Sequence, residues 1–109
     1  MIVTVAGGTF EGPKLKGKVA EGASGDWLLV RPDGSMRLDV RITLRTDDGA
    51  AILMCYSGLI VGKEGSRAFR TAPLFDTGEA RCAWLNDIQA VGIGKYGASG
   101  PVYEVYALL

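Results

Sequence analysis

The chain has 109 residues, of which 48% are hydrophobic, a length and composition typical of one compact domain spanning residues 1–109. Lys and Arg total 12, Asp and Glu total 12, and histidine is absent, so the formal net charge is zero. A zero net charge argues against phosphate-driven binding of nucleic acid, and the lack of histidine excludes histidine-based triads, metal ligands and proton shuttles.

Location and redox state follow from simple patterns. No stretch approaches the roughly 18 apolar residues of a membrane span, and the N-terminal residues lack the basic region of a signal peptide. We therefore expect a cytoplasmic protein with no membrane partner. Cys55 and Cys82 belong to no CxxC pair and are interpreted as buried free thiols. No phosphate-binding loop or dinucleotide fingerprint is present, so we expect neither a cofactor nor a metal.

Turn signals recur at short intervals, and β-rich runs lie between them. No window of helical length carries an apolar repeat of 3.6 residues. The sequence predicts strands near residues 2–6, 13–20, 27–31, 35–46, 50–61, 67–71, 82–95 and 101–109. The expected fold is an all-β antiparallel meander, most economically a small β-barrel or a sheet rolled on itself, because closure removes exposed strand edges.

Two carboxylates in the first third of the chain are candidates for acid–base chemistry. Glu11 lies on a glycine-rich bend, where it either anchors the backbone or faces a barrel mouth. Asp26 stands beside Trp27 at the start of a short strand. Apolar surroundings raise the pKa of a carboxyl group, which produces a general acid without histidine. The alternative is a turn aspartate beside a core tryptophan.

The strand at 35–46 has the clearest alternation, with apolar side chains on one face and polar side chains on the other. Asp39 and Arg41 share the polar face, where an ion pair could orient an anionic substrate if that face lines the barrel. A solvated face or a subunit interface is the alternative. The next run, 50–61, is apolar on both faces apart from Tyr56 and Ser57, and is predicted to be the most buried strand.

Two later segments carry aromatic residues. Phe69 and Arg70 open the irregular stretch 69–78, interpreted as a lid over a barrel mouth. Trp84 and Asn86 share a face of the predicted strand 82–95 that continues with small residues, which leaves room for a ligand. A core tryptophan with a turn-capping asparagine is the alternative.

Several segments taken together resemble one known family. They are GGTFEGPKLKG at 7–17, GDW at 25–27, RPDG at 31–34, LDVR at 38–41, LRTDDG at 44–49, FRTAP at 69–73, WLN at 84–86 and VYEVY at 102–106. In this order, over nearly the whole chain, they look like the bacterial and fungal proteins of the domain-of-unknown-function 3237 family. The resemblance implies a small antiparallel β-barrel, similar in shape to allene oxide cyclase and dirigent-type barrels. Those barrels guide cyclisation or coupling of small hydrophobic molecules, largely by shaping the substrate.

Two departures from the family pattern predict partner subunits. Members usually begin with a further strand pair, and they carry a longer insertion where this chain has only residues 62–66. Strand edges exposed by these differences can pair with a second subunit. We therefore expect a homo-oligomer, with a dimer favoured. A shorter barrel that closes on fewer strands is the alternative.

Together these features predict a small-molecule enzyme that binds an apolar, oxygenated metabolite in a barrel cavity and catalyses cofactor-free cyclisation, isomerisation or elimination. The candidate catalytic residues are the carboxylates that would transfer a proton and the donors that would orient a substrate oxygen: Glu11, Asp26, Asp39, Arg41 and Asn86. The candidate substrate-binding residues are Trp27, Tyr56, Phe69, Arg70 and Trp84. A non-catalytic binding barrel and a structural oligomer are the alternatives.

Overall fold

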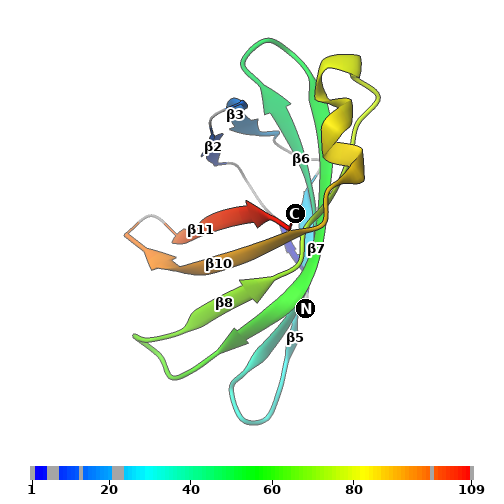
Figure 1. Ribbon diagram of the computed structural model, residues 1–109. Helices are drawn as coiled ribbons and strands as arrows, with labels where there is room; N and C mark the ends of the chain where they lie inside the picture. Colours follow the sequence, from blue (N-terminus) through cyan, green and yellow to red (C-terminus); the bar gives the residue numbers. More distant parts are fainter. Residues whose placement is uncertain (1, 5–7, 13, 21–23, 99, 109) are drawn as a thin grey trace.

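The computed structural model describes residues 2–4, 8–12, 14–20, 24–98 and 100–108. In these residues one antiparallel sheet of eleven strands curls into a half barrel, with a short 3-10 helix at one end (Figure 1). The elements are β1 (Ile2–Thr4), β2 (Thr9–Glu11), β3 (Lys16–Val19), β4 (Gly25–Trp27), β5 (Leu29–Val30), β6 (Met36–Thr46), β7 (Ala51–Val61), β8 (Ala68–Thr71), β9 (Leu74–Asp76), η1 (Ala80–Asp87), β10 (Ala90–Gly97) and β11 (Gly100–Ala107). The predicted all-β antiparallel fold is confirmed.

The long β6–β7 hairpin is the centre of the sheet, because most of the other strands pair with β6 or β7. The strand order is β1-β4-β6-β7-β8-β10-β11, while β3 and β5 also pair with β6, β9 pairs with β7, and β2 pairs with β3. In Figure 1 the hairpin runs the height of the molecule, and β8, β10 and β11 curve away from it. No pairing joins β1 to β11 within the described ranges, so the sheet is a half barrel with an open side.

The concave side of the sheet holds the core. Along β6 the predicted alternation is confirmed, because Leu38, Val40, Ile42 and Leu44 are buried while the residues between them are exposed or half-buried. Directly opposed residues of antiparallel strands present their side chains on the same face. The register therefore continues this face across β7 and β8, where the buried residues are Ile52, Met54, Ile60 and Phe69.

The prediction that 50–61 is the most buried strand is wrong. Burial alternates along β7, and Leu53, Leu59 and Val61 on its convex side are exposed. The physical reason is that the half barrel covers only one face of the strand. Both cysteines are free, and Cys82 is buried as predicted, whereas Cys55, which faces the convex side, is half-buried.

The first half of the predicted strand 82–95 is instead the 3-10 helix η1, and β10 begins only at Ala90. Cys82 and Leu85 are the buried residues of this helix, and they stand three positions apart. Three residues complete one turn of a 3-10 helix, so this spacing puts both on the core side. Within the described ranges, no helix is both long enough and apolar enough to cross a membrane.

The strand predicted near 67–71 is confirmed by β8, but the interpretation of 69–78 as a lid is wrong, since much of this stretch belongs to the sheet. β8 lies between β7 and β10, and β9 pairs with β7. Phe69 and Thr71 alternate with exposed neighbours and point into the core, which explains why the segment is a strand rather than a cover. Glu11 lies in β2 opposite Lys16 of β3, rather than on a bend.

Candidate functional site

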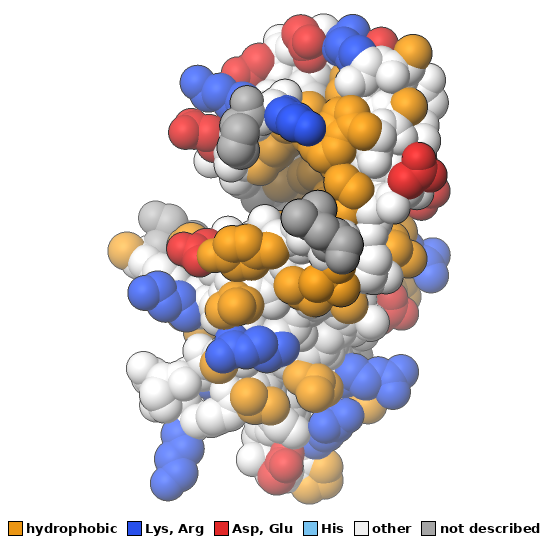
Figure 2. Space-filling model, in the orientation of Figure 1, with side chains coloured by type: hydrophobic (Ala, Val, Ile, Leu, Met, Phe, Trp, Pro, Cys, Tyr) orange, Lys and Arg blue, Asp and Glu red, His pale blue; other side chains and the backbone are white. Residues whose placement is uncertain are grey.

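A row of side chains that includes a carboxyl group crosses the concave face of the sheet. In the register, Asp26 of β4 is opposite Val40 of β6, and Val40 is opposite Tyr56 of β7. Val40 is buried on the concave side, so the side chains of Asp26 and Tyr56 lie on that side too. Figure 2 shows the open side between the β2–β3 and β10–β11 hairpins as a hollow with hydrophobic side chains gathered on its upper wall.

A second row of side chains on the concave face ends at a tyrosine of β11, the last strand of the sheet. It runs from Ile60 through Phe69 and Gly94 to Tyr103 of β11. A Cβ atom on Gly94 would lie 2.7 Å from Cδ1 of Tyr103 and 2.9 Å from the carbonyl oxygen of Val102. The Tyr103 ring therefore occupies the space that a side chain at position 94 would take.

Small residues also fill the row between these two. Gly58, Thr71 and Gly92 oppose one another on the concave side. A Cβ atom on Gly58 would overlap the backbone of β8, and one on Gly92 would overlap the hydroxyl of Thr71. Across β7, β8 and β10, this row of the concave face is consequently backbone covered by a single threonine.

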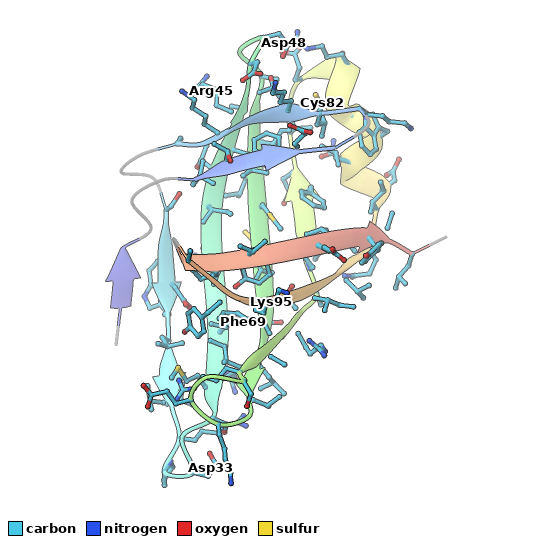
Figure 3. All side chains as sticks on the ribbon, turned by 90° about the vertical axis from the view of Figure 1, so that its left-hand side faces the viewer. Asp33, Arg45, Asp48, Phe69, Cys82 and Lys95 are labelled. Atoms are coloured by element: carbon cyan, nitrogen blue, oxygen red, sulfur yellow. The ribbon has the colours of Figure 1, made fainter. Side chains whose placement is uncertain are left out.

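The curl of the sheet brings the tyrosine and phenylalanine rings together. Tyr103 meets Phe69 edge to face with 5.5 Å between ring centroids, and it meets Tyr56 at 5.8 Å. Tyr96 of β10 packs on the same Phe69 ring at 4.8 Å. We call Asp26, Tyr56, Phe69, Tyr96 and Tyr103 the concave cluster. In Figure 3 Phe69 lies at mid-height, between the turns marked by Asp33 and Asp48.

The carboxyl group of the concave cluster lies in a partly dehydrated setting. Partial burial raises the pKa of Asp26 above its ordinary value of 3.8. The backbone N–H of Asp39 donates a hydrogen bond to Oδ1 of Asp26 at 3.3 Å, which favours the ionised form, whereas the nearby Asp39 carboxylate disfavours it. Burial has the largest effect, so Asp26 holds its proton to a higher pH than a solvated aspartate.

Two phenols accompany this carboxyl group. Burial raises the pKa of both Tyr56 and Tyr103, and the negative charge of Asp26 raises both further. The neighbouring Tyr56 side chain raises the pKa of Tyr103 further. Both phenols are protonated at neutral pH, so they are available to donate to an oxygen atom of a bound molecule.

Asp39, Arg41 and Trp27 lie on the convex face. The side chains of Asp39 and Arg41 are exposed on the polar side of β6, as in the solvated-face alternative. The Arg41 guanidinium lies 5.4 Å from the centroid of the Trp27 ring, and the Trp27 side chain is 48% exposed. These three residues are separated from Asp26 by the sheet itself.

Trp84 and Asn86 lie in η1, beside one end of the β6–β7 hairpin (Figure 1). The side chain of Asn86 accepts a hydrogen bond from the Thr77 N–H at 2.8 Å and donates one to the Thr77 carbonyl at 3.1 Å. Trp84 is exposed and lies under the ammonium group of Lys14, 4.8 Å from the ring centroid. Asn86 therefore fastens η1 to the segment after β9.

The remaining predicted residues, Glu11 and Arg70, lie outside the concave cluster. Glu11 is exposed on β2, and Arg70 is exposed on β8, where its Nη1 donates to the Phe69 carbonyl oxygen at 2.8 Å. Of the ten predicted residues, the structure brings three together on the concave side: Asp26, Tyr56 and Phe69. Sequence reasoning missed Tyr96 and Tyr103. The signal for Tyr103 is its register with Gly94, and the signal for Tyr96 is its place two residues after Gly94 on the same face of β10. The described residues contain no group of three His, Cys, Asp or Glu side chains placed to bind a metal ion.

Comparison with known proteins places this geometry in a family. The family model described as "Protein of unknown function (DUF3237)" matches residues 1–108. A solved β-barrel-like protein from Acinetobacter baumannii AYE superposes with a TM-score of 0.91 at 30% identity, covering 99% of this chain and 77% of that one. A UPF0311 protein of Rhodopseudomonas palustris is 28% identical over 122 residues, which cover 99% of this chain and 79% of the relative.

One relative has a named activity. The hydroalkoxylation enzyme phnH of Penicillium herquei is 36% identical to this chain over 90 residues. The match covers 82% of this chain and 53% of that enzyme. A distant homologue is therefore named as a hydroalkoxylation enzyme, while the solved Rhodopseudomonas palustris relative is described as a protein of unknown function.

Proposed function

The chain belongs to the DUF3237 protein family, and from the chemistry of its concave cluster we propose that it closes rings in apolar, oxygenated small molecules by acid–base catalysis without a cofactor. The reaction we assign to it is addition of a hydroxyl group across a carbon–carbon double bond of the same molecule. The observation that carries the proposal is a partly buried carboxyl group beside two protonated phenols on the concave side of the sheet.

Asp26 is the proton donor and acceptor in this reaction. Its protonated carboxyl group gives the proton to one carbon of the double bond, and the substrate hydroxyl oxygen attacks the other carbon. The hydroxyl proton then goes to the Asp26 carboxylate, which restores the acid. A C–H bond and a C–O bond form while an O–H bond and the π bond break, so substrate and product are isomers. A raised pKa suits this role because more of the carboxyl group is protonated near neutral pH.

The aromatic residues of the concave cluster orient the substrate and stabilise charge. Tyr56 and Tyr103 donate hydrogen bonds to a substrate oxygen and fix the distance between the reacting groups. The faces of aromatic rings attract positive charge, so Phe69, which packs on Tyr103, favours the carbocation that forms after protonation. Because the rings pack on one another, they hold these positions before the substrate arrives.

The named activity of the Penicillium relative supports this choice of reaction, since hydroalkoxylation is addition of an alcohol across a double bond. The choice of Asp26 as the acid rests on the present chain alone. Glu11 is exposed on β2 and Asp39 lies on the convex side, so neither shares the partly dehydrated setting of Asp26.

The test uses phenols that carry an ortho-prenyl group, whose closure to cyclic ethers is followed by mass spectrometry in D2O. Turnover should place one deuterium on the protonated carbon. Asp26→Asn should lower the rate about 100-fold or more, the range of a general acid. The matched control is Asp76→Asn, the same change at an exposed aspartate of β9.

Other outcomes of this assay reassign the function. If Glu11→Gln or Asp39→Asn lost as much activity as Asp26→Asn, the acid would be that residue instead. If the phenols bound to the protein with no ring closure, the assignment as an enzyme would be wrong and a binding barrel would replace it.

We also propose that the chain forms a homodimer through the edge of its sheet. The end strand β11 pairs only with β10 in the described residues, and Val102, Val105 and Tyr106 on it are exposed. Two copies of β11 related by a twofold axis would pair antiparallel and satisfy the backbone groups at this edge.

A further inference from the structure

Arg67 is a half-buried cation that forms no ion pair with the described residues. Its Nε atom is buried and has no hydrogen-bond partner among the residues that the structure describes. The nearest polar contact of its guanidinium is the Sδ atom of Met36, 3.9 Å from Nη1, and thioether sulfur is a weak acceptor. The ion pairs of the described residues both involve Arg81, so none of these residues places a carboxylate within ion-pair distance of Arg67.

Arg67 lies on the concave side of the sheet. It directly precedes β8 and stands two residues before Phe69, and side chains two apart on an extended strand share a face. Its contact with Met36 agrees with this placement, because Met36 is opposite Ile60 in the core register. Arg67 also lines a hollow of about 410 Å³ together with Glu64, Gly65 and Tyr96.

The other arginines of the central strands face the opposite way. Arg37, Arg41 and Arg45 on β6 and Arg70 on β8 are exposed on the convex side, where water solvates them. Arg67 differs because part of its guanidinium is shielded from water beside the aromatic rings of the concave cluster. A buried donor without an acceptor is costly, and it is satisfied when a bound molecule supplies one.

We propose that Arg67 binds the carboxylate of an aromatic acid whose rings lie along Tyr96 and Phe69 toward Asp26. The inference rests on the proposed function in that this acid is the substrate. The planar guanidinium presents parallel N–H donors that match the two oxygens of a carboxylate. Tyr96 lines the Arg67 hollow and packs on Phe69, and Phe69 packs on Tyr103, so the aromatic surface is continuous.

The separation between Arg67 and Asp26 sets the size of the substrate. Arg67 contacts Met36, and Asp26 is opposite Val40, four residues farther along β6. A strand rises about 3.3 Å per residue, so the two sites are separated by about 13 Å along the strand direction. A molecule of two or three fused rings with an acid at one end and a prenyl group at the other spans this distance. Glu64 also lines the hollow, so a bound carboxylate competes with it for the Arg67 guanidinium.

The test compares 2-naphthoate with its neutral amide, 2-naphthamide, by isothermal titration calorimetry. The wild-type protein should bind the carboxylate at least tenfold more tightly than the amide. Arg67→Gln should abolish this preference, and Arg67→Lys, which keeps the charge without the planar fork, should retain part of it. The matched control is Arg37→Gln, which removes an arginine beside Met36 on the convex face and should retain the full preference.

Asp26→Asn separates this proposal from the proposed reaction. This variant should keep the preference for naphthoate even though it closes no ring, so loss of turnover alone does not bear on Arg67. Circular dichroism of each variant establishes that it is folded. An unchanged preference in folded Arg67→Gln, or no saturable binding of naphthoate to the wild type, would overturn the assignment.

Discussion

Tyr56 and Tyr103 meet edge to face, 5.8 Å between ring centroids, although they come from strands three positions apart in the sheet. In a flat sheet those strands would be separated by about 14 Å, because neighbouring strands lie about 4.8 Å apart. The curl shortens this gap and couples the hydroxyls of the two residues to the charge of Asp26. The concave cluster is therefore a product of sheet curvature, and changes that alter the curvature should disturb it.

Gly94→Ala should destabilise the protein by about 1–3 kcal/mol, the usual range for an overpacked site. The new Cβ would lie 2.7 Å from the Tyr103 ring and 2.9 Å from the backbone carbonyl of Val102, and the backbone cannot move aside easily. Urea denaturation measures the effect. The control is Gly78→Ala, where no atom lies within 4 Å of the added Cβ. Equal stability of the two variants would mean that the Tyr103 ring does not rest over Gly94.

Asp26→Asn should stabilise the folded protein more at neutral pH than at acid pH. Because the folded-state pKa of Asp26 is raised above 3.8, the folded protein binds its proton more tightly than the unfolded chain does. The free energy of unfolding contributed by this group therefore falls as the pH rises from the unfolded pKa through the folded pKa. Asparagine carries no charge at any pH, so in Asp26→Asn the free energy of unfolding does not fall for this reason as the pH rises.

Urea denaturation of wild type and Asp26→Asn at about pH 3 and pH 7 checks the direction. Asp76→Asn, at an exposed aspartate, is the reference for the same chemical change. A stability difference between Asp26→Asn and wild type that does not grow with pH would contradict the dehydrated setting of Asp26.

Asn86→Ala should lower the free energy of unfolding by about 1 kcal/mol, because it removes two hydrogen bonds to the backbone of Thr77. Asn86→Asp keeps the acceptor for the Thr77 N–H, so its free energy of unfolding should lie between those of the wild type and Asn86→Ala. The comparison is Asp87→Ala, at the exposed neighbouring position. Ring-closure rates per folded molecule should match wild type in all three, and a specific loss of rate in Asn86→Asp would restore Asn86 to the site.

Sedimentation velocity at micromolar concentration should detect a dimer. Lysine on an exposed edge strand opposes pairing with another edge, so the double variant Val102→Lys and Tyr106→Lys should sediment as a monomer. Leu29→Lys, an equally exposed apolar position on β5, serves as the control and should remain dimeric. A monomeric wild type would exclude the edge-paired dimer.

The sequence predicts strands well where one periodicity fits alone. The alternation from Met36 to Arg45 admits only a strand with one buried face, and the structure agrees. At 82–88 two periodicities compete. Trp84, Asn86 and Ile88 fit a strand, while Cys82 and Leu85 fit a 3-10 turn, and the burial of Cys82 and Leu85 in the core decides the outcome.

The site is harder to predict because it depends on pairing between distant strands. Local context singled out Asp26, which has an aromatic neighbour in the sequence. Nothing near Tyr103 or Arg67 marks them, since their partners Gly94 and Met36 come from other strands. Asp26 and Asp39 could likewise be ranked only from the register. The Asp26 carboxylate lies on the concave side, where it accepts a hydrogen bond from the backbone N–H of Asp39, whereas the Asp39 side chain lies on the convex side.

The glycines opposite Thr71 have a consequence for how this surface discriminates among molecules. Gly58 and Gly92 leave peptide groups and one small side chain as the floor of the concave face. Peptide groups in a paired sheet have no rotamers to exchange, so the floor loses almost no conformational entropy when a molecule settles on it. It also does not yield to a molecule of the wrong shape. For the proposed substrate, selectivity at the centre of this surface would therefore arise from steric exclusion, and adaptation to different molecules would be left to the aromatic and charged side chains around it.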